Sequence, residues 1–117
     1  MNNREVGSFY EEMAVSYLME HGYHILERNY SHRTGEIDLI AKDGAYYVFI
    51  EVKYRTTAQK GYPEEAIDYR KRKHITETAR YYLMKHGLSE YTPCRFDVVS
   101  ILNEEITLIQ DAFDATN

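Results

Sequence analysis

Two short apolar segments joined by Asp43-Gly44 constrain this chain most, because charged side chains interrupt both of them. Residues 35–41 and 48–55 are rich in Ile, Val and aromatic residues, a composition that favours β-strands. An Asp-Gly pair between two apolar runs is typical of a hairpin turn. The two segments are therefore predicted to be neighbouring strands.

Side chains alternate between the two faces of a strand, so each predicted strand has an apolar and a polar face. On the first strand the apolar face holds Ile37, Leu39 and Ala41, and the polar face holds Glu36 and Asp38. On the second strand Ile50 and Val52 share one face, and Glu51, Lys53 and Arg55 share the other. Ionised groups within apolar strands are costly unless they are paired or bind a metal.

Asp38, Glu51 and Lys53 are therefore candidates for a site. Carboxylate oxygens suit a hard divalent cation such as Mg²⁺. A lysine two residues beyond the glutamate lies on the same strand face, within reach of a water on that metal. This combination suits metal-assisted hydrolysis of a phosphodiester. The alternative is a cross-strand ion pair between Lys53 and one carboxylate on a solvated sheet face.

The order of these residues resembles the PD-(D/E)XK nucleases, the restriction-endonuclease-like superfamily. Within it, the chain resembles most the YraN-like family of small bacterial endonuclease-like proteins, which is related to archaeal Holliday-junction resolvases. The resemblance runs from about Gly7 to Ile101. The residues that carry it are Gly7, Glu11, Ala14, Asn29, residues 35–40, residues 49–53, Lys71 and residues 95–99.

The resemblance implies roles for individual residues. Asp38 and Glu51 would bind Mg²⁺ or Mn²⁺ together with the backbone carbonyl of Val52, and Lys53 would position or activate water. Glu11, on the first predicted helix, is a weaker candidate for a metal ligand, with surface charge as the alternative. Glu36 would support the site from the polar face of the first strand. The candidates for phosphate contact are Arg55, Gln59, Lys60, Lys71 and Arg72.

Length and composition limit the class of protein. The chain has 117 residues and 44% hydrophobic residues, which predicts one globular domain over residues 1–117. No apolar run approaches the ~20 residues that a membrane span needs. The N-terminus has no apolar stretch of a signal peptide. A single cysteine, Cys94, argues against disulfides and zinc-thiolate sites and fits a cytoplasmic location.

The net charge of −5 counts against a simple nucleic-acid-binding protein, but the charge is unevenly distributed. Residues 51–80 carry a net charge of +3 and the remainder carries −8. The basic segment directly follows the predicted catalytic strand, as expected of a surface that contacts phosphates. The alternative is a solvated helix face.

Hydrophobic periodicity and turn residues predict an α/β domain with a mixed central sheet flanked by helices, in the order α-β-β-β-α-β-β. This order agrees with a restriction-endonuclease-like fold. Helices are expected over 5–21 and from about Pro63 to His86. Strands are expected over 23–30, 35–41, 48–55, 94–102 and 106–109, and residues 111–117 are expected to form a loose tail.

The predicted function is a metal-dependent endonuclease acting on DNA, including branched or otherwise structured DNA. A nucleic-acid- or partner-binding module with little turnover is the first alternative. A structural interaction protein is the second, supported by twelve tyrosines and an acidic surface. Resemblance to enzymes that cut junctions symmetrically suggests a homodimer.

Overall fold

The computed structural model describes residues 3–56 and 67–116. In this part of the chain the predicted element order α-β-β-β-α-β-β is confirmed. The elements are α1 (Asn3–Glu20), β1 (His24–His32), β2 (Gly35–Asp43), β3 (Tyr46–Arg55), α2 (Tyr69–Lys85), β4 (Cys94–Leu102) and β5 (Glu105–Phe113). None of the helices in these two ranges is both long and apolar enough to cross a membrane.

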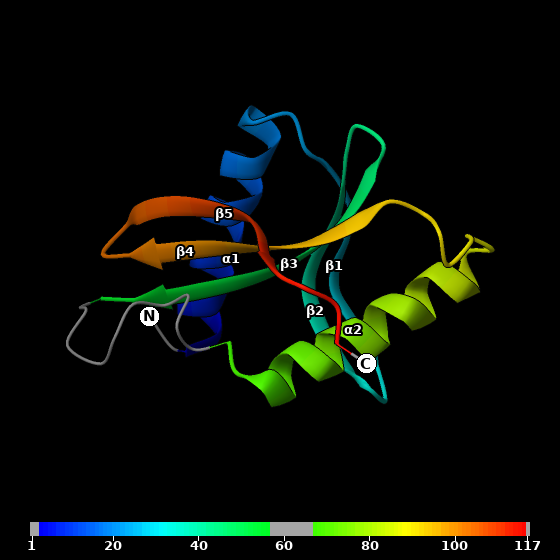
Figure 1. Cartoon of the computed structure of the whole chain (residues 1–117). Coiled ribbons are helices and arrows are strands. Elements are labelled where there is room, and N and C mark those ends of the chain that lie inside the picture. Colours follow the sequence, from blue (N-terminus) through cyan, green and yellow to red (C-terminus); the bar gives the residue numbers. More distant parts are fainter. Residues whose placement is uncertain (1–2, 57–66, 117) are drawn as a thin grey trace.

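The five strands form one mixed sheet in the order β1-β2-β3-β4-β5. β3 and β4 are parallel, and the other neighbouring strands are antiparallel. A parallel pair needs a long crossover connection, and α2 belongs to that connection. Helix α1 lies behind the sheet in Figure 1, and α2 lies in front of it. The fold is therefore a three-layer α/β arrangement.

An apolar core lies on each face of the sheet. The core under α1 contains Tyr10, Ala14, Val15, Leu18, Tyr23, Leu39, Ala41, Val48, Ile50, Val99 and Ile101. The core under α2 contains Ile37, Ile40, Phe49, Ile75, Ala79, Tyr82, Leu83 and Phe96. Alternation along β3 and β4 supplies both cores, because the middle strands of the sheet are covered on both faces.

One predicted face is wrong. Ile37 was expected beside Leu39 and Ala41, but it packs under α2, whereas they pack under α1. The pairing of β2 with β3 ends at Leu39 and Ile50, so Ile37 lies on the part of β2 that has left β3. Strict alternation of side chains between the two faces therefore does not hold along the whole of β2.

Two element boundaries also differ from the prediction. Helix α2 begins at Tyr69, because Asp68 is its N-cap and accepts a hydrogen bond from the Lys71 N–H at 2.9 Å. Pro63 lies outside the described residues. β5 reaches Phe113, so residues 111–113 belong to a strand and not to a tail. Phe113 stacks on Phe96 with ring centroids 5.1 Å apart, which fixes this end of the strand on the core.

Gly35 shows how closely α2 approaches the β1–β2 hairpin. A Cβ atom at this position would lie 3.1 Å from His74 Cβ and 3.3 Å from Thr78 Oγ1, and its φ is +149°. The hydroxyls of Thr34 and Thr78 hydrogen-bond at 2.8 Å across the same contact. The glycine that opens β2 thus lets the helix pack directly on the strand that carries Asp38.

Candidate functional site

The predicted carboxylates Asp38 and Glu51 meet where β2 separates from β3. The last backbone pair between these strands joins Leu39 to Ile50, one residue before Asp38 and Glu51 would face each other. At this point Asp38 Oδ2 accepts a hydrogen bond from the Val52 N–H at 2.8 Å. A side chain from β2 therefore satisfies a backbone donor of β3, and this contact holds the Asp38 carboxylate beside Glu51.

Glu51 is buried on the α2 face of the sheet, with 4% of its surface exposed. Burial, followed by the hydrogen bond and the like charge of Asp38, raises the pKa of Glu51 to about 8, against the opposing effects of Lys71 and Lys53. Among the described residues, Glu51 Oε2 is buried and has no hydrogen-bond partner. Burial and Asp38 therefore favour the protonated form of Glu51, and the two lysines favour its ionised form.

Two lysines from different elements surround this carboxylate. Lys53 is half-buried, two residues after Glu51 on β3, and its charge lowers the pKa of Glu51. Lys71 comes from the first turn of α2, and its Nζ lies 3.5 Å from Glu51 Oε2. The structure thus brings together Asp38, Glu51, Lys53 and Lys71, of which the first three are the predicted catalytic residues.

The donor set suits a hard cation. The carboxylates of Asp38 and Glu51, with the carbonyl of Val52, are oxygen donors of the type that Mg²⁺ and Mn²⁺ prefer. Glu51 Oε2 is buried and forms an ion pair with Lys71 but no hydrogen bond within the described part of the chain, so it is an acceptor that a metal cation would satisfy. Within the described ranges no three His, Cys, Asp or Glu side chains gather closely enough to hold a metal. Water or substrate oxygens would complete the coordination, as is usual for Mg²⁺.

Glu11 has a different partner in this structure. Both of its carboxylate oxygens lie 3.3 Å from Nδ2 of Asn29, a β1 residue with a φ of 52°. This contact joins α1 to β1, and both residues belong to the motif that supports the family resemblance. A role for Glu11 as a metal ligand remains a prediction.

The other predicted residues lie in varied surroundings. Glu36 is exposed on β2. Arg55 ends β3, and its Nε is buried without a hydrogen-bond partner in the described part of the chain. Arg72 is half-buried and lines a cavity of about 190 Å³ together with residues of β4 and β5. Gln59 and Lys60 lie outside the described residues, so their roles stay predictions.

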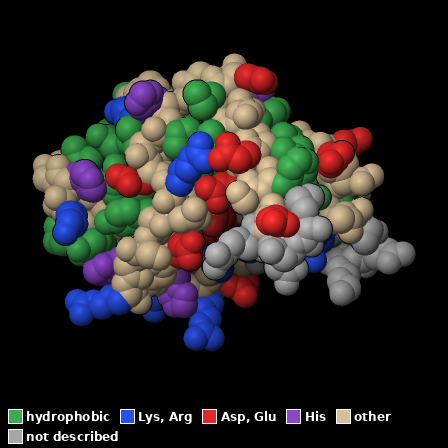
Figure 2. Space-filling view, turned by 180° about the vertical axis from the view of Figure 1, so that it is seen from behind, with side chains coloured by type: hydrophobic (Ala, Val, Ile, Leu, Met, Phe, Trp, Pro, Cys, Tyr) green, Lys and Arg blue, Asp and Glu red, His purple; other side chains and the backbone are tan. Residues whose placement is uncertain are grey.

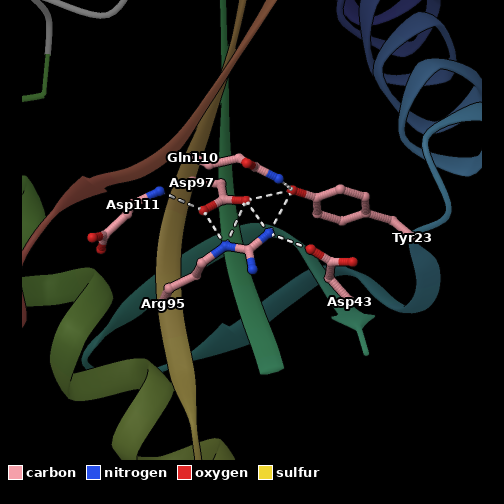
Figure 3. Close-up of polar contacts among 6 residues, drawn as sticks. All are labelled: Tyr23, Asp43, Arg95, Asp97, Gln110 and Asp111. Carbon is pink, nitrogen blue, oxygen red and sulfur yellow. Dashed lines mark hydrogen bonds and ion pairs between the residues drawn. The ribbon is translucent and has the colours of Figure 1, made fainter. Parts of the chain in front are cut away.

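A second polar cluster, which sequence analysis did not single out as a site, lies on the α1 face of the sheet (Figure 3). Asp97 is fully buried, and its Oδ1 accepts hydrogen bonds from Arg95 Nε at 3.0 Å and the Asp111 N–H at 2.9 Å. The Tyr23 hydroxyl donates to Asp97 Oδ2 at 2.7 Å. It also accepts from Arg95 Nη2 at 2.7 Å and Gln110 Nε2 at 2.9 Å.

The Arg95–Asp97 cluster joins distant parts of the chain. Arg95 Nη2 also donates to Asp43 Oδ2 at 2.7 Å, so the cluster links the β2–β3 turn to β4, β5 and the start of β1. One signal was available in the sequence, because Arg95 and Asp97 alternate within an apolar strand as Glu51 and Lys53 do. The polar atoms of the Arg95–Asp97 cluster hydrogen-bond to one another, which is typical of a structural network.

The face that carries α1 has a mixed surface. In Figure 2, which views the molecule from behind, acidic side chains lie across the middle of this face, and several Lys, Arg and His side chains gather along its lower left edge. Hydrophobic side chains are interspersed among them. Both signs of charge are therefore present on this face.

Comparisons with known proteins give a consistent result. Residues 10–101 match the model of "Uncharacterised protein family UPF0102". A UPF0102 protein of Lachnoclostridium phytofermentans is 56% identical over 115 residues, which cover 98% of each chain. A UPF0102 protein of Clostridioides difficile is 46% identical over 97% of this chain and 100% of its own. The resemblance to the YraN-like family is thus confirmed, and the chain belongs to the UPF0102 (YraN) family.

Proposed function

We propose that this protein is a cytoplasmic, metal-dependent endonuclease that hydrolyses phosphodiester bonds in DNA, including branched DNA. The observation that carries the proposal is the buried Glu51 carboxyl group, which lies beside Asp38 with Oε2 unpartnered by any described hydrogen-bond donor. Lys71 Nζ lies 3.5 Å from this oxygen and offsets only part of the cost. A buried acceptor without a hydrogen bond and two carboxyl groups in contact both reduce the stability of the fold. A bound cation would remove both penalties.

Asp38, Glu51 and the Val52 carbonyl would hold the metal ion, which would supply charge neutralisation at the phosphate and a more acidic bound water. Lys53 lies on the Glu51 face of β3 and would orient the attacking water or accept its proton. The basic residues Arg55 and Arg72 would hold the DNA backbone through their charge. This division of roles separates metal binding, water activation and DNA affinity among different residues.

A binding module with little turnover is the second candidate, and one observation favours it. Asp38 already accepts the Val52 N–H, and Lys71 already faces Glu51, so the site is partly satisfied by the protein itself. A protein that only bound DNA or a partner would keep these contacts throughout. The presence of Lys53 beside Glu51, with Asp38 in contact with the same carboxyl group, favours the nuclease over this alternative, because binding alone does not need the complete trio.

A cleavage screen tests the proposal. Labelled linear, flapped and four-way DNAs are incubated with the protein and Mg²⁺ or Mn²⁺, and Asp38→Asn serves as the matched inactive variant. We expect cleavage of at least one substrate by the wild type and none by Asp38→Asn. Cleavage by both proteins would indicate a contaminating enzyme. DNA binding without cleavage of any substrate would favour the binding module.

A further inference from the structure

Lys71 is placed where a helix normally disfavours a cation. It is the third residue of α2, whose first turn contains no acidic residue. The N-terminal end of a helix has a partial positive charge that repels a lysine. Arg70, Arg72 and Lys73 flank it in the sequence and add like charges. A compensating partner is therefore expected, and the structure provides Glu51.

The contact reaches from the surface into the core. The Lys71 side chain is 38% exposed, whereas the Glu51 side chain is 5% exposed, and Nζ lies 3.5 Å from Oε2. The Lys71 backbone is fixed at the same time, because its N–H donates to the N-cap Asp68 at 2.9 Å. Because the side chain is flexible and the backbone is fixed, the ammonium group of Lys71 can lie either against Glu51 or in solvent.

We propose that Lys71 is an internal counter-cation of Glu51, which holds the carboxylate in the metal-free protein and is displaced when a divalent cation binds there. This inference rests on the proposed function, since it assumes that Glu51 is a metal ligand. The Lys71 ammonium group lies 3.5 Å from Glu51 Oε2, so a divalent cation bound by Glu51 would add a like charge near it, and like charges repel. The released lysine would then be free to contact a DNA phosphate.

Lys71 is thus a positioning residue for the site and not a catalytic one. In the metal-free protein Lys71 contacts Glu51, and in the metal-bound protein it contacts the DNA backbone. The two states couple metal binding to DNA binding: a cation on Glu51 frees a positive charge for the substrate. Lys53 remains on its own strand in both states, and this keeps the two lysines distinct in role.

The rate of acetylation of Lys71 by an amine-reactive ester, followed by mass spectrometry, tests this exchange without DNA. Lys73 of the same helix is exposed and serves as the internal reference. In the metal-free wild type we expect Lys71 to react several-fold more slowly than Lys73, because its amine is held against Glu51 and is less accessible to the reagent. Addition of Mg²⁺ should remove most of that difference. In Glu51→Gln, Lys71 should react quickly with or without Mg²⁺.

Melting temperatures measured with Mg²⁺ and Mn²⁺ separate the two ways in which the inference fails. If the metal raises the melting temperature of the wild type but leaves Lys71 labelling unchanged, Lys71 is not displaced, and only this inference is overturned. If neither metal changes the melting temperature, the metal site and the proposed function fail together with it. Slow labelling of Lys71 in Glu51→Gln would also overturn the inference, because Glu51 would not be what holds it.

Discussion

Glu51 and Asp97 are buried acidic residues on neighbouring parallel strands, and the structure treats them in opposite ways. Asp97 pairs in register with Ile50, and Glu51 pairs with Val98, so the two positions are one residue apart along the sheet. Asp97 faces the α1 side, where Tyr23, Arg95 and the Asp111 N–H satisfy it. Glu51 faces α2. Its neighbour there is a second carboxylate, Asp38, and its Oε2 accepts no hydrogen bond from any described residue, so Glu51 is poorly satisfied.

The difference separates a stabilising network from a candidate site. A buried carboxylate with a bidentate-type arginine contact and several donors is strongly held in one state. A buried carboxyl group that contacts a second carboxylate gains from protonation or from a cation, so its state depends on pH and on ligands. The comparison predicts that substitutions at Asp97 act on folding and those around Glu51 act on function.

The largest effect is expected from Asp97→Ala. Removing this carboxylate leaves the Arg95 side chain, which is 14% exposed, without its principal partner. Breaking a buried ion pair from one side typically costs about 3–5 kcal/mol of unfolding free energy. Urea denaturation at neutral pH measures the loss, with Glu51→Gln as the matched buried-acid control. An Asp97→Ala protein as stable as the wild type would end the structural interpretation of this network.

The second-largest effect is expected from metal binding, which should involve the Asp38–Glu51 site and not the Arg95–Asp97 cluster. At a free Mn²⁺ concentration about 100 times the Kd, binding to the folded state alone adds about 2.7 kcal/mol of stability. We expect Asp38→Asn to abolish this gain, measured as the Mn²⁺-induced shift of the melting temperature. Asp43→Asn, which alters the other cluster on the same strand, should keep the shift. A shift that persists in Asp38→Asn would place the metal elsewhere.

Lys53→Ala should reduce turnover while leaving metal binding unchanged, because both carboxylates remain. If Lys53 orients or deprotonates the attacking water, cleavage should fall by about 10²-fold, the scale of a general acid–base group. Lys53→Arg should restore little activity, because its guanidinium is a poor substitute for a compact ammonium group. Lys42→Ala on β2 is the control for loss of a lysine. Cleavage at the wild-type rate by Lys53→Ala would contradict the mechanism.

The pH dependence of stability should differ between Glu51→Gln and the metal-free wild type. The pKa of Glu51 rises from 4.5 to about 8 on folding, so the folded state binds the extra proton between these values. The stability that this proton confers is complete below pH 4.5 and is lost as the pH rises to about 8. Glu51→Gln should therefore gain stability relative to the wild type across this range, by about 1 kcal/mol or more.

Chemical denaturation in a chelating buffer across that pH range measures this difference. Asp38→Asn provides an independent check, because it removes the neighbouring charge that opposes ionisation of Glu51. It should flatten the pH dependence while leaving Glu51 in place. Parallel pH profiles for the wild type and Glu51→Gln would mean that Glu51 is not held protonated.

The smallest effect is expected in the salt dependence of DNA binding. Each phosphate contact contributes about 0.9 to the slope of log affinity against log salt concentration. Lys71→Ala and Arg72→Ala should each reduce the slope by about one contact, measured by fluorescence anisotropy in the presence of metal. Lys85→Ala, at the other end of α2, should leave it unchanged. If Lys71→Ala and Arg72→Ala have the same slope as the wild type, the basic segment is a solvated helix face and does not contact DNA.

Much of the fold could be predicted from the sequence because its signals are local. Period-2 alternation marked the strands, Asp43-Gly44 marked the hairpin, and the order of elements followed. The site trio was also visible, since charged residues in apolar strands are rare. The late start of α2 was missed because Pro63 and the acidic residues 64 and 65 are also typical of a first helical turn, and they lie before the Asp68 cap.

What the sequence by itself determined is which residues are placed on which strand, and hence that Asp38, Glu51 and Lys53 are candidates for one site. Only the tertiary structure decided how each charge is satisfied. The separation of β2 from β3, the packing of α2 and the long-range partners of Asp97 depend on residues distant in the chain. Burial and partners determine the state of an ionisable group, and no local pattern specifies either.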